Sequence, residues 1–246
     1  MLKIENLTGG YVNIPVLKNI SFKIKHGENI GVIGKTGCGK TTLVDLLLRL
    51  YNVEDNTIFI DDIDINRIPI KTLRKYSSYV PQDNFLFSDT IESNIAFAYE
   101  YVNKDDVIKA SKLADVHDNI IGFEKGYETI LGERGVTISG GQKQRTSIAR
   151  ALMKDASILI LDDSVSAVDT KTEKVILNNL KETRSGKTTL LIAHRISTVQ
   201  DLDKILFLED GKVLGFDTHE NLYNTLEEYR NMVELQRLEE EKGGNE

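Results

Sequence analysis

This chain contains the eight residues Gly34-Lys35-Thr36-Gly37-Cys38-Gly39-Lys40-Thr41, which match the pattern G-x-x-x-x-G-K-S/T. A short apolar run, Asn29 to Ile33, precedes them, and apolar residues at helical spacing follow from Lys40 to Tyr51. In such a strand–loop–helix unit the glycines let backbone N–H groups turn inward around phosphate groups, and the helix N-terminus adds partial positive charge. The stretch therefore predicts a phosphate-binding loop at the end of a buried strand.

Three side chains at the end of this loop have predicted roles at a triphosphate. We expect Lys40 to reach the β and γ phosphates, Thr41 to place its hydroxyl on Mg²⁺, and Thr42 to help hold the α phosphate. The alternative interpretation is a glycine-rich turn that precedes Lys-Thr by chance. The strand before the loop and the helix after it make that alternative the weaker one.

Three apolar runs, Asn29 to Ile33, Ser157 to Leu161 and Thr188 to Ala193, indicate strands buried on both faces, as in a parallel α/β sheet. Helical patterns follow them over Lys40 to Tyr51 and Thr172 to Thr183. The sequence therefore predicts an α/β fold.

Other parts of the chain have different patterns. Period-two alternation over 20–24 and 58–60 predicts short antiparallel strands. Residues 83 to about 155 are typical of helix and loop, with helices over Asp105 to Ala114 and Gln142 to Lys154. A helical pattern from Leu222 to Lys242 decays into a tail, which we expect to be frayed. We favour one domain with lobes, 1–235, followed by an acidic tail, 236–246.

Composition excludes several classes of protein. With 246 residues and a net charge of -7, the chain is large enough for a real core and too acidic for its main partner to be a nucleic acid. The single cysteine, Cys38, excludes a disulfide within the chain. No run approaches the roughly 18 apolar residues of a membrane helix, and Met1 to Glu5 lacks the layout of a secretory signal. We expect a soluble chain.

An acid follows the second buried strand. Asp162 comes directly after Ile158 to Leu161, at the end of a strand where α/β proteins place ligand chemistry. A phosphate-binding loop needs such an acid to hold Mg²⁺, so Asp162 is the candidate metal residue.

A second anion-binding helix start is predicted at Ile138 to Arg145, where Ser139, Gly140 and Gly141 come before a helix. With this stretch the sequence resembles the ATP-binding cassette (ABC) ATPases, whose signature reads LSGGQ. The resemblance covers residues 3 to 232. It implies a P-loop NTPase (RecA-like) core with a parallel sheet, an antiparallel β subdomain and an inserted α-helical subdomain at about 83–155.

The resemblance also implies roles for individual residues. Tyr11 matches an aromatic that stacks on adenine, Gln82 matches a glutamine that touches Mg²⁺ and the attacking water, and His194 matches a switch histidine at the γ phosphate. Residues Ser166 to Asp169 match a loop that crosses to a partner subunit. The implied nucleotide-binding residues are Tyr11, Val16, Gly34, Lys35, Thr36, Gly37, Cys38, Gly39, Lys40, Thr41, Thr42, Ser139, Gly140, Gly141 and Gln142. The implied catalytic residues are Asp163, His194 and Gln82, and the implied metal residues are Thr41, Gln82 and Asp162.

In this family two cassettes sandwich two ATP molecules head to tail. Ser139, Gly140, Gly141 and Gln142 would therefore serve the nucleotide on the partner's loop. A loop around Glu133, and the stretch Gln82 to Ile95, resemble the parts of exporters that touch the coupling helices of a membrane domain. We expect an exporter cassette at the cytoplasmic face of a membrane. A stand-alone importer subunit remains the alternative, because it would begin at a methionine.

Asp163 departs from the family pattern, which has glutamate as general base. Aspartate is one methylene shorter, and a general base must lie within hydrogen-bond reach of the proton that it takes, so this site is expected to hydrolyse ATP slowly. Aspartate at this position resembles the degenerate half of a heterodimeric exporter. The other hypothesis is a working ATPase with Asp163 as an adequate base.

DNA-repair and translation ATPases are disfavoured, because the chain has no room for a coiled-coil insertion or a second cassette. Finally, we expect the helix N-terminus and Lys40 to lower the pKa of Cys38.

Overall fold

The computed structural model describes residues 1–11, 14–132 and 138–243. Contacts within the chain divide it into two compact units. The first unit consists of Met1–Arg74 and Thr188–Glu246, and the second unit of Lys75–Lys187. The second unit is wider than the predicted helical part at about 83–155, because two strands and a long helix pack with the predicted helices.

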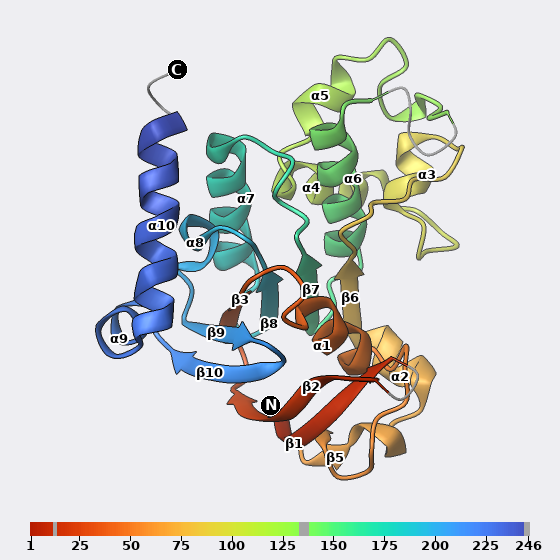
Figure 1. The fold of residues 1–246 in the computed structure, drawn as a ribbon. Helices are drawn as coiled ribbons and strands as arrows, with labels where there is room; N and C mark the ends of the chain where they lie inside the picture. The colour runs from red at the N-terminus through yellow and green to blue at the C-terminus, as the bar shows by residue number, and fades with distance from the viewer. Residues whose placement is uncertain (12–13, 133–137, 244–246) are drawn as a thin grey trace. The chain divides into compact units, whose positions relative to one another are not determined.

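An antiparallel sheet begins the first unit (Figure 1). Strand β1 (Leu2–Tyr11) pairs with β2 (Ile14–Ile24) on one side and with β4 (Ile58–Ile60) on the other, and β5 (Ile63–Asp64) extends the sheet. In residues 20–24 every second side chain is buried, as the alternation predicts. The antiparallel strands predicted over 20–24 and 58–60 are therefore confirmed.

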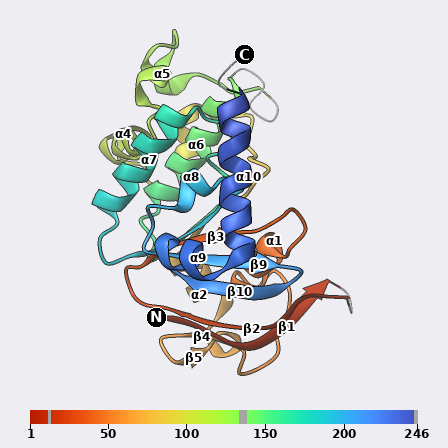
Figure 2. The ribbon, with the colours of Figure 1, turned by 60° about the vertical axis from the view of Figure 1, so that its left-hand side comes forward.

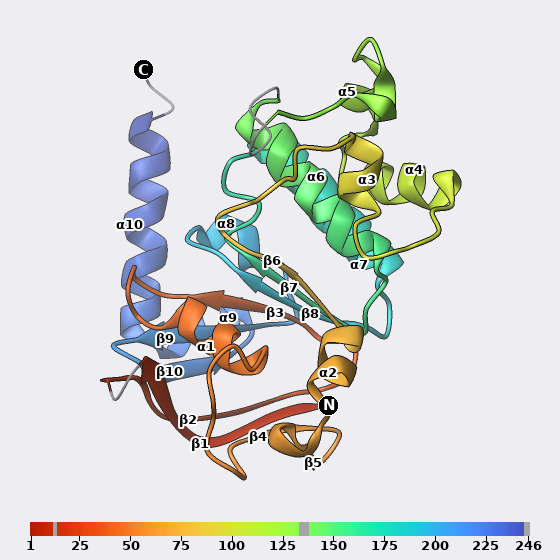
Figure 3. The same cartoon turned by 90° about the vertical axis from the view of Figure 1, so that its right-hand side faces the viewer.

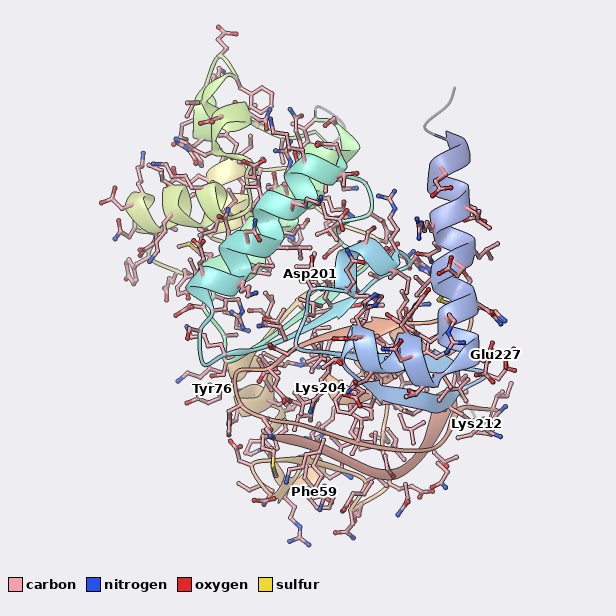
Figure 4. All side chains as sticks on the ribbon, turned by 90° about the vertical axis from the view of Figure 1, so that its left-hand side faces the viewer. Phe59, Tyr76, Asp201, Lys204, Lys212 and Glu227 are labelled. Atoms are coloured by element: carbon pink, nitrogen blue, oxygen red, sulfur yellow. The ribbon has the colours of Figure 1, made fainter. Side chains whose placement is uncertain are left out.

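Parallel strands form the second sheet of the first unit. Strand β3 (Asn29–Ile33) pairs in parallel with β8 (Thr188–Ile192) and with β9 (Lys204–Glu209), and β10 (Lys212–Asp217) is antiparallel to β9. Lys204 and Lys212, labelled in Figure 4, mark the starts of β9 and β10. All of β8 is buried, and so is β3 from Ile30 onward, which confirms the predicted parallel sheet.

The helices of this unit are short apart from the last one. Helix α1 (Lys40–Leu47) ends before the predicted Tyr51, because Arg49 adopts a left-handed φ of 50° that a helix cannot continue through. A 3₁₀ turn, η1 (Ile65–Arg67), precedes α2 (Ile70–Tyr76), which reaches the boundary between the units. Helix α8 (Ile196–Val199) is also short.

The C-terminal helical pattern forms two helices rather than one (Figure 2). Helix α9 (His219–Thr225) is separated from α10 (Glu227–Gly243) by Leu226, whose backbone is extended. Helix α10 runs through most of the predicted tail, 236–246. Tyr229 is fully buried, with its hydroxyl 2.8 Å from His219 Nδ1 and its ring centroid 5.5 Å from that of Phe207. These contacts anchor the start of α10.

The second unit contains two parallel strands and a helical part (Figure 3). Strand β6 (Ser77–Val80) pairs with β7 (Ile158–Asp162), and α7 (Thr170–Thr183) follows β7. Before β7 come α3 (Ile91–Ile95), α4 (Lys104–Leu113), α5 (His117–Ile121), η2 (Gly126–Glu128) and α6 (Gly140–Met153). Helices α3 and α4 pack on α6, so the signature helix is the centre of this part.

Candidate nucleotide site

The predicted phosphate-binding loop lies between β3 and α1. Gly34 and Gly39 have no room for a side chain, because a Cβ there would lie 2.0 Å from Leu208 O and 2.7 Å from Leu17 Cδ2. Gly37 has a φ of 82° and open space beside it. The glycines therefore let the backbone pass close to β9 and β2 and leave its outer side open to a ligand.

Lys40 is folded back onto its own loop. Its Nζ donates to Gly34 O at 2.7 Å and to Lys35 O at 3.2 Å, and the residue is only 6% exposed. The ammonium group is thus held at the centre of the loop by two carbonyl oxygens. Phosphate oxygens are stronger acceptors for this charge than neutral carbonyls, so a bound triphosphate can replace these partners.

The N-terminus of α1 is open toward an anion. Its N-cap is Gly39, no side chain caps the free N–H groups, and the first turn contains no acid. Thr41 is exposed at this end, whereas Thr42 is buried and donates to Tyr11 Oη at 3.2 Å. The helix dipole and unpaired N–H groups favour negative charge at this position.

Tyr11 is tied to α1. Its hydroxyl donates to Asp45 Oδ2 at 2.8 Å, and its ring meets Tyr51 edge-on with centroids 4.9 Å apart. Burial and the neighbouring carboxylate raise the pKa of Tyr11, although the bond from Thr42 acts in the opposite direction. Val16 lies beside the loop, 3.3 Å from a Cβ placed on Gly39. That Tyr11 and Val16 contact a nucleotide stays a prediction.

Cys38 is buried, with 3% of its surface exposed, and burial raises the pKa of its thiol. Lys40 Nζ lies 3.9 Å from Sγ and acts in the opposite direction, but its effect is smaller than that of desolvation. The lowered pKa expected from the sequence is therefore wrong, because the side chain turns inward, away from water.

Alkylation of Cys38 at pH 7 is expected to be at least tenfold slower in the folded protein than in the denatured one. The raised pKa reduces the thiolate fraction, and burial limits access of the reagent. Because the chain has one cysteine, mass spectrometry after iodoacetamide treatment reads this site alone. Equal rates in folded and denatured protein would contradict the buried position, and Mg-ATP is expected to slow the reaction further.

His194 follows β8 and has an exposed side chain. With Gly34, Lys35, Thr36 and residues of β9 and α10, it lines a pocket of about 500 Å³. The first unit therefore brings His194 and the start of the loop to one pocket. That His194 contacts a γ phosphate stays a prediction.

The two acids at the end of β7, Asp162 in the strand and Asp163 directly after it, belong to the second unit. Asp162 is buried and accepts from Tyr79 Oη at 3.4 Å, whereas Asp163 is half-buried and has a left-handed φ of 46°. Gln82 Nε2 lies 3.4 Å from Asp163 Oδ2, at the long end of a hydrogen bond. The unit thus brings Gln82 and Asp163 together.

Gln144 is a residue that the sequence reasoning missed. It is buried in α6, its Nε2 donates to Asp163 O at 3.2 Å, and its Oε1 accepts from Ala167 N at 3.0 Å. Ser166 Oγ also donates to Asp163 O, at 2.9 Å. The signature helix therefore holds the backbone after β7 in place. No local pattern distinguishes Gln144 from the other polar residues of α6.

Ser139 begins α6 with a capping box: its Oγ accepts from Gln142 N at 3.2 Å, and Gln142 Oε1 accepts from Ser139 N at 3.0 Å. Ser139 and Gly140 are exposed, and a Cβ on Gly140 would meet nothing within 4 Å. Since the hydroxyl accepts in this box, its proton remains free to point outward. The predicted contact at Glu133 lies outside the described residues.

Comparison with known proteins identifies the family. A family model described as "ABC transporter" matches residues 17–166, which is more than half of the chain. The chain belongs to the ABC transporter family. The match confirms the resemblance and the α/β P-loop fold, and it implies that the domain binds ATP.

Similar proteins include the "ATP-dependent lipid A-core flippase" of Syntrophus aciditrophicus, 40% identical over 245 residues, 100% of this chain and 41% of the flippase. A "Probable multidrug resistance ABC transporter ATP-binding/permease protein" of Bacillus subtilis is 44% identical over 229 residues, 93% of this chain and 39% of that protein. The solved "Structure of a bacterial Atm1-family ABC exporter with ATP bound" superposes with a TM-score of 0.93 at 38% identity, over 96% of this chain and 42% of that one.

This ABC family chain spans about two fifths of the length of these relatives. Among the residues that the structure describes, no helix is both long and apolar enough to cross a bilayer. Of these relatives, one is described as a flippase, one as an ATP-binding/permease protein and one as an exporter.

Proposed function

We propose that this chain is the ATP-binding and ATP-hydrolysing cassette of a membrane exporter, at the cytoplasmic face of the membrane. The observation that carries the proposal is the loop 34–39, which leads into an open helix N-terminus and holds the Lys40 ammonium group on its own carbonyls. The first residues of the loop line one pocket with His194. This arrangement binds a triphosphate through backbone N–H groups and Lys40, with His194 beside the γ phosphate.

The residues present also fit Mg²⁺. Thr41 offers an exposed hydroxyl, and Asp162 ends a buried strand as a carboxylate. Hydroxyl, carboxylate, phosphate and water oxygens are the hard ligands that Mg²⁺ takes, and it needs few protein groups. No cluster of three or more His, Cys, Asp or Glu side chains suits a metal in the described ranges, and a nucleotide-held Mg²⁺ does not require one. Bound Mg²⁺ would neutralise phosphate charge, and the family resemblance implies Thr41, Gln82 and Asp162 as the residues that would hold it.

Each composite site would be completed by a second cassette. The exposed Ser139 and Gly140 at the start of α6 form a helix N-terminus whose hydroxyl proton is free to donate. A γ phosphate on a partner's loop is the acceptor that suits this end, and residues Ser166 to Asp169 would cross to the same partner. We propose that the partner is a different cassette with glutamate at the position of Asp163.

The membrane partner would dock on an aromatic cluster of the second unit. Phe85, Phe87 and Phe97 are exposed, and the rings of Phe87 and Phe97 stack with centroids 4.5 Å apart. The Arg150 guanidinium lies 5.6 Å from the Phe87 ring centroid and donates to Asn94 O and Phe85 O; burial lowers its pKa to about 10. This exposed apolar surface, which begins three residues after Gln82 in the sequence, supports contact with the coupling helices of a transmembrane domain.

Mg-ATP is expected to convert the monomer to a dimer, because each of two nucleotides would bridge the phosphate-binding loop of one cassette and the helix start that corresponds to Ser139 and Gly140 in the other. Sedimentation velocity at rising Mg-ATP measures this for the purified protein mixed with a cassette that has glutamate at the position of Asp163. Mg-ADP, which lacks the γ phosphate, is the matched control and should leave monomers. Failure to bind ATP would refute the cassette assignment, and binding without association would refute the composite site.

A further inference from the structure

Gln236 of α10 bonds to both sides of the histidine loop. Its Nε2 donates to His194 O at 2.7 Å, and its Oε1 accepts from Ile196 N at 2.7 Å. The two partners lie 42 and 40 positions away along the chain, and all three residues belong to the first unit. One amide group thus spans the backbone from His194, two residues after β8, to Ile196, the first residue of α8.

These two bonds compensate for a gap in the local structure. The N-cap of α8, Arg195, provides no side-chain cap, so the N–H of Ile196 needs a partner from elsewhere. Gln236 supplies it and at the same time satisfies the carbonyl of His194. The backbone on either side of Arg195 is therefore held, while the His194 imidazole stays exposed and lines the pocket beside Gly34 and Thr36.

Helix α10 presents Gln236 at a defined place. Tyr229, buried against Phe207 and bonded to His219, lies seven residues earlier. Seven residues are close to two full turns, so Tyr229 and Gln236 lie on the same face of the helix. The buried tyrosine anchors the face that carries the amide.

We infer that Gln236 is a positioning residue for His194: the amide holds the loop so that the imidazole points at the γ phosphate. This inference rests on the proposed function for the role of His194, whereas the attachment of Gln236 to the histidine loop rests on its two hydrogen bonds. It assigns to the C-terminal helix a part in the nucleotide site that the motifs do not contain.

The first test replaces the amide with an apolar side chain of similar size, Gln236→Leu. We expect kcat for ATP hydrolysis to fall about tenfold with KM for ATP unchanged, because the loop, not the phosphate cradle, loses its two hydrogen bonds. Arg237→Leu on the same helix is the matched control, since the Arg237 side chain is exposed and bonds to Glu241 of the same helix at 3.3 Å. An unchanged kcat, or a rise in KM alone, would overturn the inference.

The second test, Gln236→Glu, separates positioning from simple docking of α10. An ionised carboxylate accepts from Ile196 N–H but cannot donate to His194 O, whereas a protonated carboxyl can do both. The ratio of the variant's kcat to that of the unsubstituted protein should therefore rise as pH falls from 8 to 5. A ratio that does not change with pH would contradict a role for the donated bond.

A spectroscopic measurement keeps the inference independent of hydrolysis. The chain has four histidines, and the imidazole NMR signal that is lost in His194→Ala is that of His194. Without nucleotide, Gln236→Leu should shift or broaden the His194 signal and leave those of His26 and His117 in place. An unmoved His194 signal would overturn the inference. No hydrolysis by the unsubstituted protein, or no shift with Mg-ATP, would instead refute the proposed function.

Discussion

Replacing Asp163 with glutamate is expected to raise the rate of ATP hydrolysis by roughly 10²–10⁴-fold. The added methylene extends the carboxylate toward the attacking water, and a general base acts only within about 2.6–3.2 Å of the proton that it takes. The backbone at this position is held by Gln144 and Ser166, which both donate to Asp163 O, and the side chain is half-buried, so the longer side chain can extend without a shift of the chain.

Asp163→Gln is the matched control for this change, because it adds the same methylene without a base. We expect it to hydrolyse ATP no faster than the unsubstituted protein and to bind ATP equally well. The measurement is steady-state phosphate release at saturating Mg-ATP, together with nucleotide affinity. A rate for Asp163→Glu that is unchanged or reduced would refute the degenerate site and favour Asp163 as an adequate base.

Replacing Lys40 with alanine is expected to weaken ATP binding by about 10²-fold, because charge-assisted hydrogen bonds to phosphate oxygens are lost. The ammonium group is buried at the centre of the loop, where water cannot replace it. Equilibrium dialysis with ATP measures the affinity, and a melting curve shows whether the fold is retained.

Lys23→Ala, an exposed lysine of β2, is the charge-matched control and should leave ATP affinity within about twofold, because exposed charges interact weakly through water. Tight ATP binding by Lys40→Ala would contradict the phosphate-binding loop. Because Lys40 also bonds to Gly34 O and Lys35 O, a small loss of thermal stability accompanies the loss of affinity.

Local patterns in the sequence predict the buried strands β3, β7 and β8 and the phosphate-binding loop, whereas β1, β6, β9 and β10 are not predicted from them. Buried strands appear as apolar runs, and β3 begins and ends where its run does, at Asn29 and Ile33. The capping box of Ser139 and Gln142 begins α6 within two residues of the predicted position. These features depend on residues a few positions apart, so the sequence alone carries them.

Other features depend on groups far apart in the chain, and the sequence could not show them. Helix α1 ends early at a left-handed Arg49, and the C-terminal helix breaks at Leu226, although both patterns continue. The pKa of Cys38 rises because the thiol is buried, which outweighs the nearby Lys40. Burial is a property of the packed chain rather than of neighbouring residues.

The sequence by itself determined the family, the parallel sheet, the phosphate-binding loop and the substitution of aspartate for the usual glutamate, because each is a matter of residue type at a fixed spacing. Only the tertiary structure decided which glutamine side chains hold the backbone beside Asp163 and His194. Gln144 reaches the backbone of Asp163 and Ala167 from α6, and Gln236 spans His194 and Ile196 from a helix about 40 residues later. An amide side chain has no local signature for such bonds, since its partners are backbone groups that any sequence offers.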